Sequence, residues 1–137
     1  MALRSAAGVR GGIAFLTRLP VETDSDDWDR FRAFPAAFPL VAYLIGALAA
    51  LPFVVPGIAP PTTAFGYLLA LVFVVGIPHL DGVADLGDAM AAHGSGNRRS
   101  ALKDTDVGVG AVVAVAVVAI GVVLAALVVL QRVRVLP

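Results

Sequence analysis

Residues 107–130, VGVGAVVAVAVVAIGVVLAALVVL, contain only apolar residues and glycine. A helix that crosses the hydrocarbon core of a bilayer needs about 20 such residues. Residues 37–56 and 62–80 form two further apolar stretches, joined by a short turn rich in proline and glycine. The sequence therefore predicts an all-α, polytopic membrane protein with about three transmembrane helices.

The composition agrees with a membrane protein and excludes several kinds of site. Apolar residues make up 59% of the 137 residues and charged ones only 15%, whereas soluble domains carry about 25% charged residues. A soluble chain of this length cannot enclose three helices that are apolar on all sides. The net charge of zero gives no reason to expect a nucleic-acid partner. With no cysteine and two histidines, the chain has no disulfide, no thiolate nucleophile and no multi-histidine metal site of its own.

The N-terminal segment, residues 1–35, is expected to lie at the membrane surface. Its first apolar stretch is short and interrupted by arginines, which favours an interfacial or re-entrant helix over a signal peptide. Residues 22–34, ETDSDDWDRFRAF, are expected to form an interfacial loop with solvated aspartates, and with Trp28 and Phe34 at headgroup level. We treat residues 1–137 as a single membrane domain.

The basic residues predict the orientation. Several arginines precede the first apolar stretch, and others lie between the second and the third. Because cytoplasmic segments are enriched in Lys and Arg, residues 81–106 are expected to form a cytoplasmic loop. Arg132 and Arg134 then fall on the other side, so we expect the chain to be part of a longer protein that returns through the membrane.

The segment HLDGVADLGDA, residues 79–89, is the strongest candidate for a functional site. Asp81, Asp85 and Asp88 follow an apolar stretch directly, where ionisable groups usually serve ions, protons or substrates. In a helix over residues 80–92 their i, i+4, i+7 spacing places them on one face, where they repel each other. A divalent cation would relieve that repulsion, and Mg²⁺ binds one or two carboxylates together with phosphate oxygens. The sequence predicts a magnesium site for a diphosphate substrate.

Further candidates flank the aspartates. His79 is read as a metal ligand, a general base or an orienting partner of Asp81, or equally as a residue that makes a local hydrogen bond. Gly82 leaves room for a ligand. The remaining candidates are basic or acidic residues of the following loop, read as phosphate-binding or catalytic, although a basic membrane anchor is the plainer interpretation of the arginines: Arg98, Arg99, Lys103 and Asp104.

Four blocks of this sequence resemble one family. They are FLTRLPV at 15–21, FPLVAYLIG at 38–46, HLDGVADLGDA at 79–89 and LKDTDVGVG at 102–110. In this order and spacing they resemble cobalamin-5'-phosphate synthase, also called adenosylcobinamide-GDP ribazoletransferase. Members of that family are nearly twice as long, so the resemblance covers their N-terminal half. In many of them a basic residue stands where this chain has Asp106.

The resemblance implies a reaction and a place in the cell. Adenosylcobinamide-GDP is joined to alpha-ribazole or its 5'-phosphate with release of GMP, at the membrane of a prokaryotic cell and on its cytoplasmic side. The implied metal ligands for Mg²⁺ are Asp81, Asp85 and Asp88, and one aspartate can instead act as the base. Lys103 and Asp104 are the implied catalytic pair, and we add Arg18 of the first block to the substrate-binding residues. Three helices are few for a substrate as large as a corrinoid, so a homo-oligomer is also expected.

Three other functions remain open on the sequence. A CDP-alcohol phosphotransferase also uses aspartates at the membrane edge with a divalent metal, but its longer motif is incomplete here. A small ion transporter is a second alternative, although its acidic residues would interrupt an apolar stretch and here they follow one. The third alternative is an assembly subunit without catalytic activity.

Overall fold

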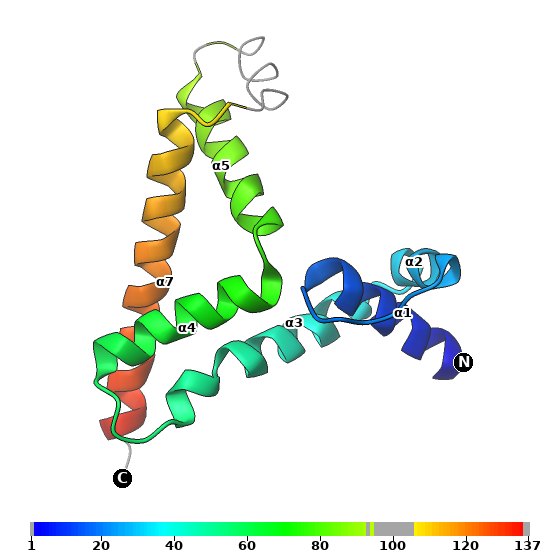
Figure 1. The fold of residues 1–137 in the computed structure, drawn as a ribbon, viewed down its shortest axis with the longest axis horizontal. Helices are drawn as coiled ribbons and strands as arrows, with labels where there is room; N and C mark the ends of the chain where they lie inside the picture. The colour runs from blue at the N-terminus through cyan, green and yellow to red at the C-terminus, as the bar shows by residue number, and fades with distance from the viewer. Residues whose placement is uncertain (1, 93, 95–105, 136–137) are drawn as a thin grey trace. The chain divides into compact units, whose positions relative to one another are not determined.

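The computed structural model describes residues 2–92, 94 and 106–135, and within these residues it contains helices and no strand. The helices, in chain order, are α1 (Ala2–Leu16), α2 (Ser25–Arg32), α3 (Ala37–Ala49), the short 3₁₀ helix η1 (Leu51–Val54), α4 (Pro60–Val75), α5 (Pro78–Ala91) and α7 (Val109–Val135) (Figure 1). The predicted all-α class is confirmed.

The chain divides into two compact units. The first contains Met1–Gly57 and Leu69–Gly76, and the second contains Ile58–Leu68 and Ile77–Pro137. The first unit therefore holds α1, α2 and α3, and the second holds α5 and α7, while α4 contributes to both.

In the first unit, α1 packs closely against α2. A side chain at Gly11 would collide with the backbone of Asp27, and one at Gly12 would lie 3.0 Å from the ring of Phe31. These glycines let the two helices approach until Phe31 is 1% exposed. Val41 of α3 completes this small core and is fully buried.

An ion pair fixes the start of α2 to α1. Asp24 and Asp27 form a capping box, in which each carboxylate accepts the backbone N–H of the other residue at 2.9 and 3.1 Å. The guanidinium of Arg10 donates to both oxygens of Asp27, at 2.7 and 2.8 Å. These bonds lower the pKa of Asp27 below its usual range and raise the pKa of Arg10.

The loop predicted for residues 22–34 is wrong in its main part, because Ser25–Arg32 is a helix. The capping box at Asp24 and Asp27 is the physical reason, since it satisfies two N–H groups that otherwise have no helical partner. Asp27 is also not solvated as predicted, because its side chain is 1% exposed beneath Arg10.

Among the residues that the structure describes, one helix is long and apolar enough to cross a membrane by itself. It is Val109–Val133 within α7, and only 6% of its 18-residue apolar stretch is buried in the protein. It coincides with the third predicted span, and its apolar surface suits a lipid environment. The pairs α2 with α3 and α4 with α5 pass the same test only if each is counted as one span, with bends of 104° and 100°.

The helices in the first two predicted spans are shorter than expected. The 13 residues of α3 and the 16 of α4 reach roughly 20 and 24 Å at 1.5 Å per residue. The hydrocarbon core measures about 30 Å. Within residues 37–56, α3 ends at Ala49 before Pro52 and continues only as η1.

Candidate functional site

The acidic motif lies on α5, as its spacing predicted. Pro78 occupies the first turn, where a missing backbone N–H costs nothing, and Asp81 lies in the same turn. A carboxylate near a helix N-terminus is stabilised by the partial positive charge of the free N–H groups. Asp85 and Asp88 follow at one and nearly two turns further along the helix.

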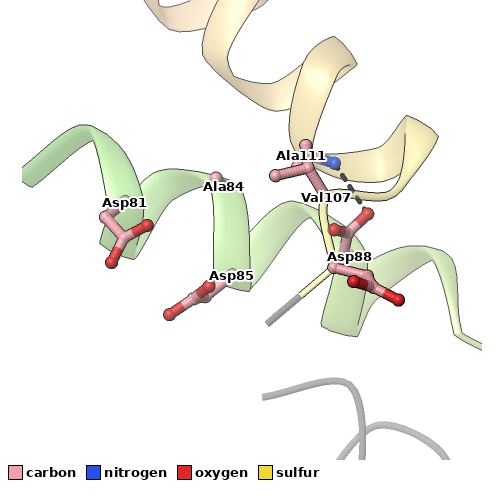
Figure 2. A pocket seen from close by; sticks show the side chains of 7 residues that line it. Asp81, Ala84, Asp85, Asp88, Val107 and Ala111 are labelled. Carbon is pink, nitrogen blue, oxygen red and sulfur yellow. Dashed lines mark hydrogen bonds between the residues drawn. The ribbon is translucent and has the colours of Figure 1, made fainter. Parts of the chain in front are cut away.

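A pocket of about 250 Å³ opens between α5 and the segment that leads into α7. Figure 2 shows its surroundings, with the aspartates on α5 and the first turn of α7 beside Asp88. Its lining residues come from both elements: Asp81, Ala84, Asp85, Asp88, Asp106, Val107 and Ala111. Four of these seven residues are aspartates, so the pocket concentrates negative charge and suits a cation or a cation-bound phosphate.

The carboxylate of Asp88 is directed at the start of α7, whereas the carboxylates of Asp81 and Asp85 are not. One oxygen of Asp88 accepts the backbone N–H of Gly108 at 2.7 Å, and the other accepts that of Ala111 at 2.8 Å. In Figure 2 its carboxylate is directed at Ala111, while those of Asp81 and Asp85 point the other way in that view. The aspartates of the motif are therefore not equivalent.

Close packing of two glycines brings α5 and α7 together. A side chain at Gly87 would meet the carbonyl of Gly110, and a side chain at Gly110 would meet the carbonyl of Gly87. Ala89 and Ala111 next to the crossing are 6% and 2% exposed. Figure 1 shows the two helices converging at the end of α5 and the start of α7.

Asp106 joins this pocket and was not among the predicted site residues. It is exposed and lies 18 residues beyond Asp88 in the sequence. Its position directly before a glycine-rich helix start was visible in the sequence. The sequence does not show which side of α5 this helix start approaches, because that depends on the contact between Gly87 and Gly110.

The other predicted site residues have different positions. His79 and Gly82 are exposed on α5 and are not among the lining residues of the pocket. Arg18 belongs to the first unit, where its backbone N–H donates to the carbonyl of Val74 at 2.8 Å. Four predicted residues lie outside the described part of the chain: Arg98, Arg99, Lys103 and Asp104.

The donor set of the pocket fits Mg²⁺ in part. Its carboxylate oxygens are the ligand type that this ion prefers, and Mg²⁺ usually takes one or two of them and keeps waters or phosphate oxygens as further ligands. Within residues 2–92, 94 and 106–135, no three acidic or histidine side chains are grouped closely enough to hold an ion by themselves. Asp81 and Asp85 therefore suit an ion that arrives with the phosphates of a substrate.

The structure thus defines a helical membrane protein with a carboxylate-lined pocket at the crossing of two helices. The sequence model of the CobS family, described as cobalamin-5-phosphate synthase, matches residues 8–136. The chain belongs to this family.

Curated relatives agree with this assignment. Over 126 residues the chain is 46% identical to the adenosylcobinamide-GDP ribazoletransferase of Haloquadratum walsbyi, covering 88% of this chain and 50% of the relative. Over 120 residues it is 51% identical to the enzyme of that name from Halorubrum lacusprofundi, covering 87% and 46%. The relative from Thermococcus onnurineus is 36% identical over 107 residues, covering 77% and 43%. The chain spans about half the length of these relatives. No solved structure matches it.

Proposed function

We propose that this chain supplies the acidic site of a magnesium-dependent transferase that joins adenosylcobinamide-GDP to alpha-ribazole or its 5'-phosphate. The relatives are named for a ribazole transfer of this kind. The observation that carries the proposal is the pocket that Asp81, Asp85 and Asp106 line together. Two of these residues belong to the motif that resembles the family.

The reaction requires charge neutralisation more than covalent chemistry. A ribose hydroxyl of the ribazole attacks the phosphorus nearer the cobinamide, a new P–O bond forms, and the bond to GMP breaks. Such transfers depend on in-line positioning and on stabilising charge at the phosphoryl oxygens. Mg²⁺, when bound with the substrate, supplies that stabilisation.

The acidic residues of the pocket bind the metal and accept a proton in this proposal. Asp81 and Asp85 hold the metal-bound diphosphate at the open side of α5. A carboxylate oxygen of either residue that is not engaged by the metal accepts the proton of the attacking hydroxyl. His79, which is exposed near the start of α5 and two residues before Asp81, is the alternative base for that proton in this proposal.

The basic residues of the sequence prediction hold the phosphates in this proposal. Lys103 stabilises the developing negative charge, and Asp104 orients the side chain of Lys103. Arg98 and Arg99 bind phosphate oxygens. Arg18 and Gly82 belong to the substrate-binding set. The bilayer surrounds α7, the pocket faces the cytoplasm, and a second copy of the chain helps to enclose the corrinoid.

The test is conversion of adenosylcobinamide-GDP and alpha-ribazole to a cobalamin and GMP, in membranes that contain this chain, with and without Mg²⁺. We expect product only with Mg²⁺. Asp81→Asn and Asp85→Asn should each lower the rate by about 100-fold, comparable to losing one stabilising contact to the transition state. Asp26→Asn is the matched control, because Asp26 is an exposed aspartate that pairs with Arg30 in the first unit.

Two results contradict the proposal. The first is full activity of both variants at normal membrane levels, since the pocket would then not serve the reaction. The second is the absence of product from this chain and also from a longer protein that contains it. Product from the longer protein alone locates further necessary residues outside this chain.

A further inference from the structure

The start of α7 receives capping hydrogen bonds from another helix. Gly108 precedes the helix and Ala111 is its third residue, and neither has a side chain that accepts a hydrogen bond. In a capping box the residue before the helix and the third helical residue each accept the other's backbone N–H. Here the carboxylate of Asp88 accepts both of these N–H groups, from a different helix.

This arrangement uses the charge of Asp88 as well as its oxygens. The free N–H groups at the start of a helix carry about half a positive charge. A carboxylate that accepts hydrogen bonds from two of these N–H groups is held in this position by both the bonds and the charge. Two of its roughly four acceptor sites are then occupied by α7, which reduces what Asp88 can offer to a metal ion.

Gly108 is fitted to the same contact. A Cβ atom at this position would lie 2.8 Å from the carboxyl carbon of Asp88 and still closer to one of its oxygens. Any other residue at 108 would therefore displace the carboxylate or the helix start. The contact between Asp88 and the start of α7 therefore requires glycine at position 108.

The contact sets the position of one wall of the pocket. Asp106 and Val107 line the pocket and directly precede Gly108. Their distance from Asp81 and Asp85 therefore depends on where Asp88 holds the start of α7. We propose that Asp88 is a positioning residue of the transferase site, which fastens the wall at Asp106 and Val107 to α5 and does not bind the metal. This inference rests on the proposed function.

Hydrogen exchange of single backbone amides tests the contact without any assay of activity. The ¹⁵N-labelled chain in lipid nanodiscs is compared with its Asp88→Asn variant. We expect exchange at Gly108 and Ala111 to accelerate at least about tenfold, the effect of losing a hydrogen bond to a charged group. Asp81→Asn, on the same face of α5, should leave both amides unchanged. Unchanged exchange in Asp88→Asn overturns the proposal.

Magnesium titrations of the transferase reaction distinguish a positioning residue from a metal ligand. We expect Asp88→Asn to lower kcat at least about tenfold without changing the Mg²⁺ concentration for half-maximal rate. Asp81→Asn should raise that concentration. A raised Mg²⁺ requirement in Asp88→Asn, or an unchanged kcat despite faster exchange, contradicts the positioning role.

Gly108→Ala approaches the same contact from α7 and retains every carboxylate. It should reproduce the faster exchange at Ala111 and the lower kcat, again with an unchanged Mg²⁺ requirement. This variant keeps the proposal testable if Asp88→Asn does not fold. Wild-type activity in Gly108→Ala overturns it. Absence of product from the wild type and from a longer protein that contains it refutes the transferase function instead, while the exchange data still decide the contact.

Discussion

Gly87 of α5 and Gly110 of α7 face each other so closely that a side chain on either would meet the carbonyl of the other. Ala91 and Ala114 flank this crossing, and their Cβ atoms would lie 2.9 and 2.6 Å from side chains added at Gly110 and Gly87. Small residues at a helix crossing allow backbones to pack closely, as in membrane helix pairs generally. The acidic pocket exists because this crossing brings the segment before α7 to α5.

The crossing predicts a large effect of one methyl group. Gly87→Ala should destabilise the α5–α7 pair by about 1–3 kcal/mol, the range for overpacked cores. Gly121→Ala is the control, because a side chain at 121 on α7 meets nothing within 4 Å, and alanine favours a helix by about 1 kcal/mol over glycine. Thermal unfolding in detergent compares the two variants. Equal melting temperatures would show that the helices do not cross at Gly87.

Asp106 should contribute to cation binding although the sequence motif omits it. It lines the pocket with Asp81 and Asp85, and a nearby exposed charge is worth up to about 1 kcal/mol. We therefore expect Asp106→Asn to raise the Mg²⁺ concentration for half-maximal activity about fivefold, with little change in the rate at saturating Mg²⁺. Asp29→Asn, in the first unit, is a control of equal charge. An unchanged Mg²⁺ requirement would separate Asp106 from the site.

The ion pair of Arg10 and Asp27 predicts acid sensitivity of the first unit. The pKa of Asp27 is lowered in the folded state by the hydrogen bonds from Arg10. A group with a lowered pKa stabilises the fold above its unfolded pKa, which is about 3.9 for Asp. That stabilisation is lost as the pH falls below about 4 and through the lower pKa of the folded state. Between this range and the strongly alkaline pH at which Arg10 loses its proton, we expect no dependence on pH from this pair.

Trp28 reports this transition directly. It is the only tryptophan in the chain and follows Asp27 on α2, so its emission should shift as the α1–α2 contact weakens in acid. Arg10→Met keeps much of the apolar stem and removes the guanidinium. This variant should show the altered emission already at pH 7. An acid transition at the same pH in Arg10→Met and in the wild type would exclude the ion pair as its cause.

The aromatic side chains of the first unit predict contact with the bilayer interface. Phe15, Trp28 and Phe38 surround the buried Phe31 with ring centroids 4.6–5.9 Å from it, and they remain 60%, 41% and 49% exposed. Exposed aromatic residues beside polar ones are typical of the membrane–water interface. The polar helix α2 meets the apolar α3 at 104°, as expected if α2 lies along the surface while α3 enters the membrane.

Quenching by brominated lipids measures the depth of Trp28. We expect lipids brominated near the headgroup to quench its emission more strongly than lipids brominated near the chain ends. Asp29→Asn alters a neighbouring polar residue and should leave this order unchanged. Efficient quenching by aqueous acrylamide with none by either lipid would place α2 away from the membrane.

Much of this organisation was accessible from the sequence because it depends on local patterns. The uncharged residues 107–130 predict a spanning helix, and the structure has α7 there. The spacing of Asp81, Asp85 and Asp88 predicts that they share one face of a helix, and all three lie on α5. Each inference needs only the period of a helix and the transfer free energy of its side chains. The resemblance of four sequence blocks led to the correct family for the same reason, since the residues of each block are adjacent in the chain.

Contacts between distant segments required the tertiary structure. The sequence predicts Asp88 as a metal ligand in the same way as Asp81. In the structure, the approach of α7 gives Asp88 two N–H partners 20 and 23 residues away. In the same way, Asp27 is buried because Arg10 of α1 binds it. Sequence periodicity places a carboxylate on a face of its own helix. Which helix that face meets depends on where two backbones approach closely, here at Gly87 and Gly110.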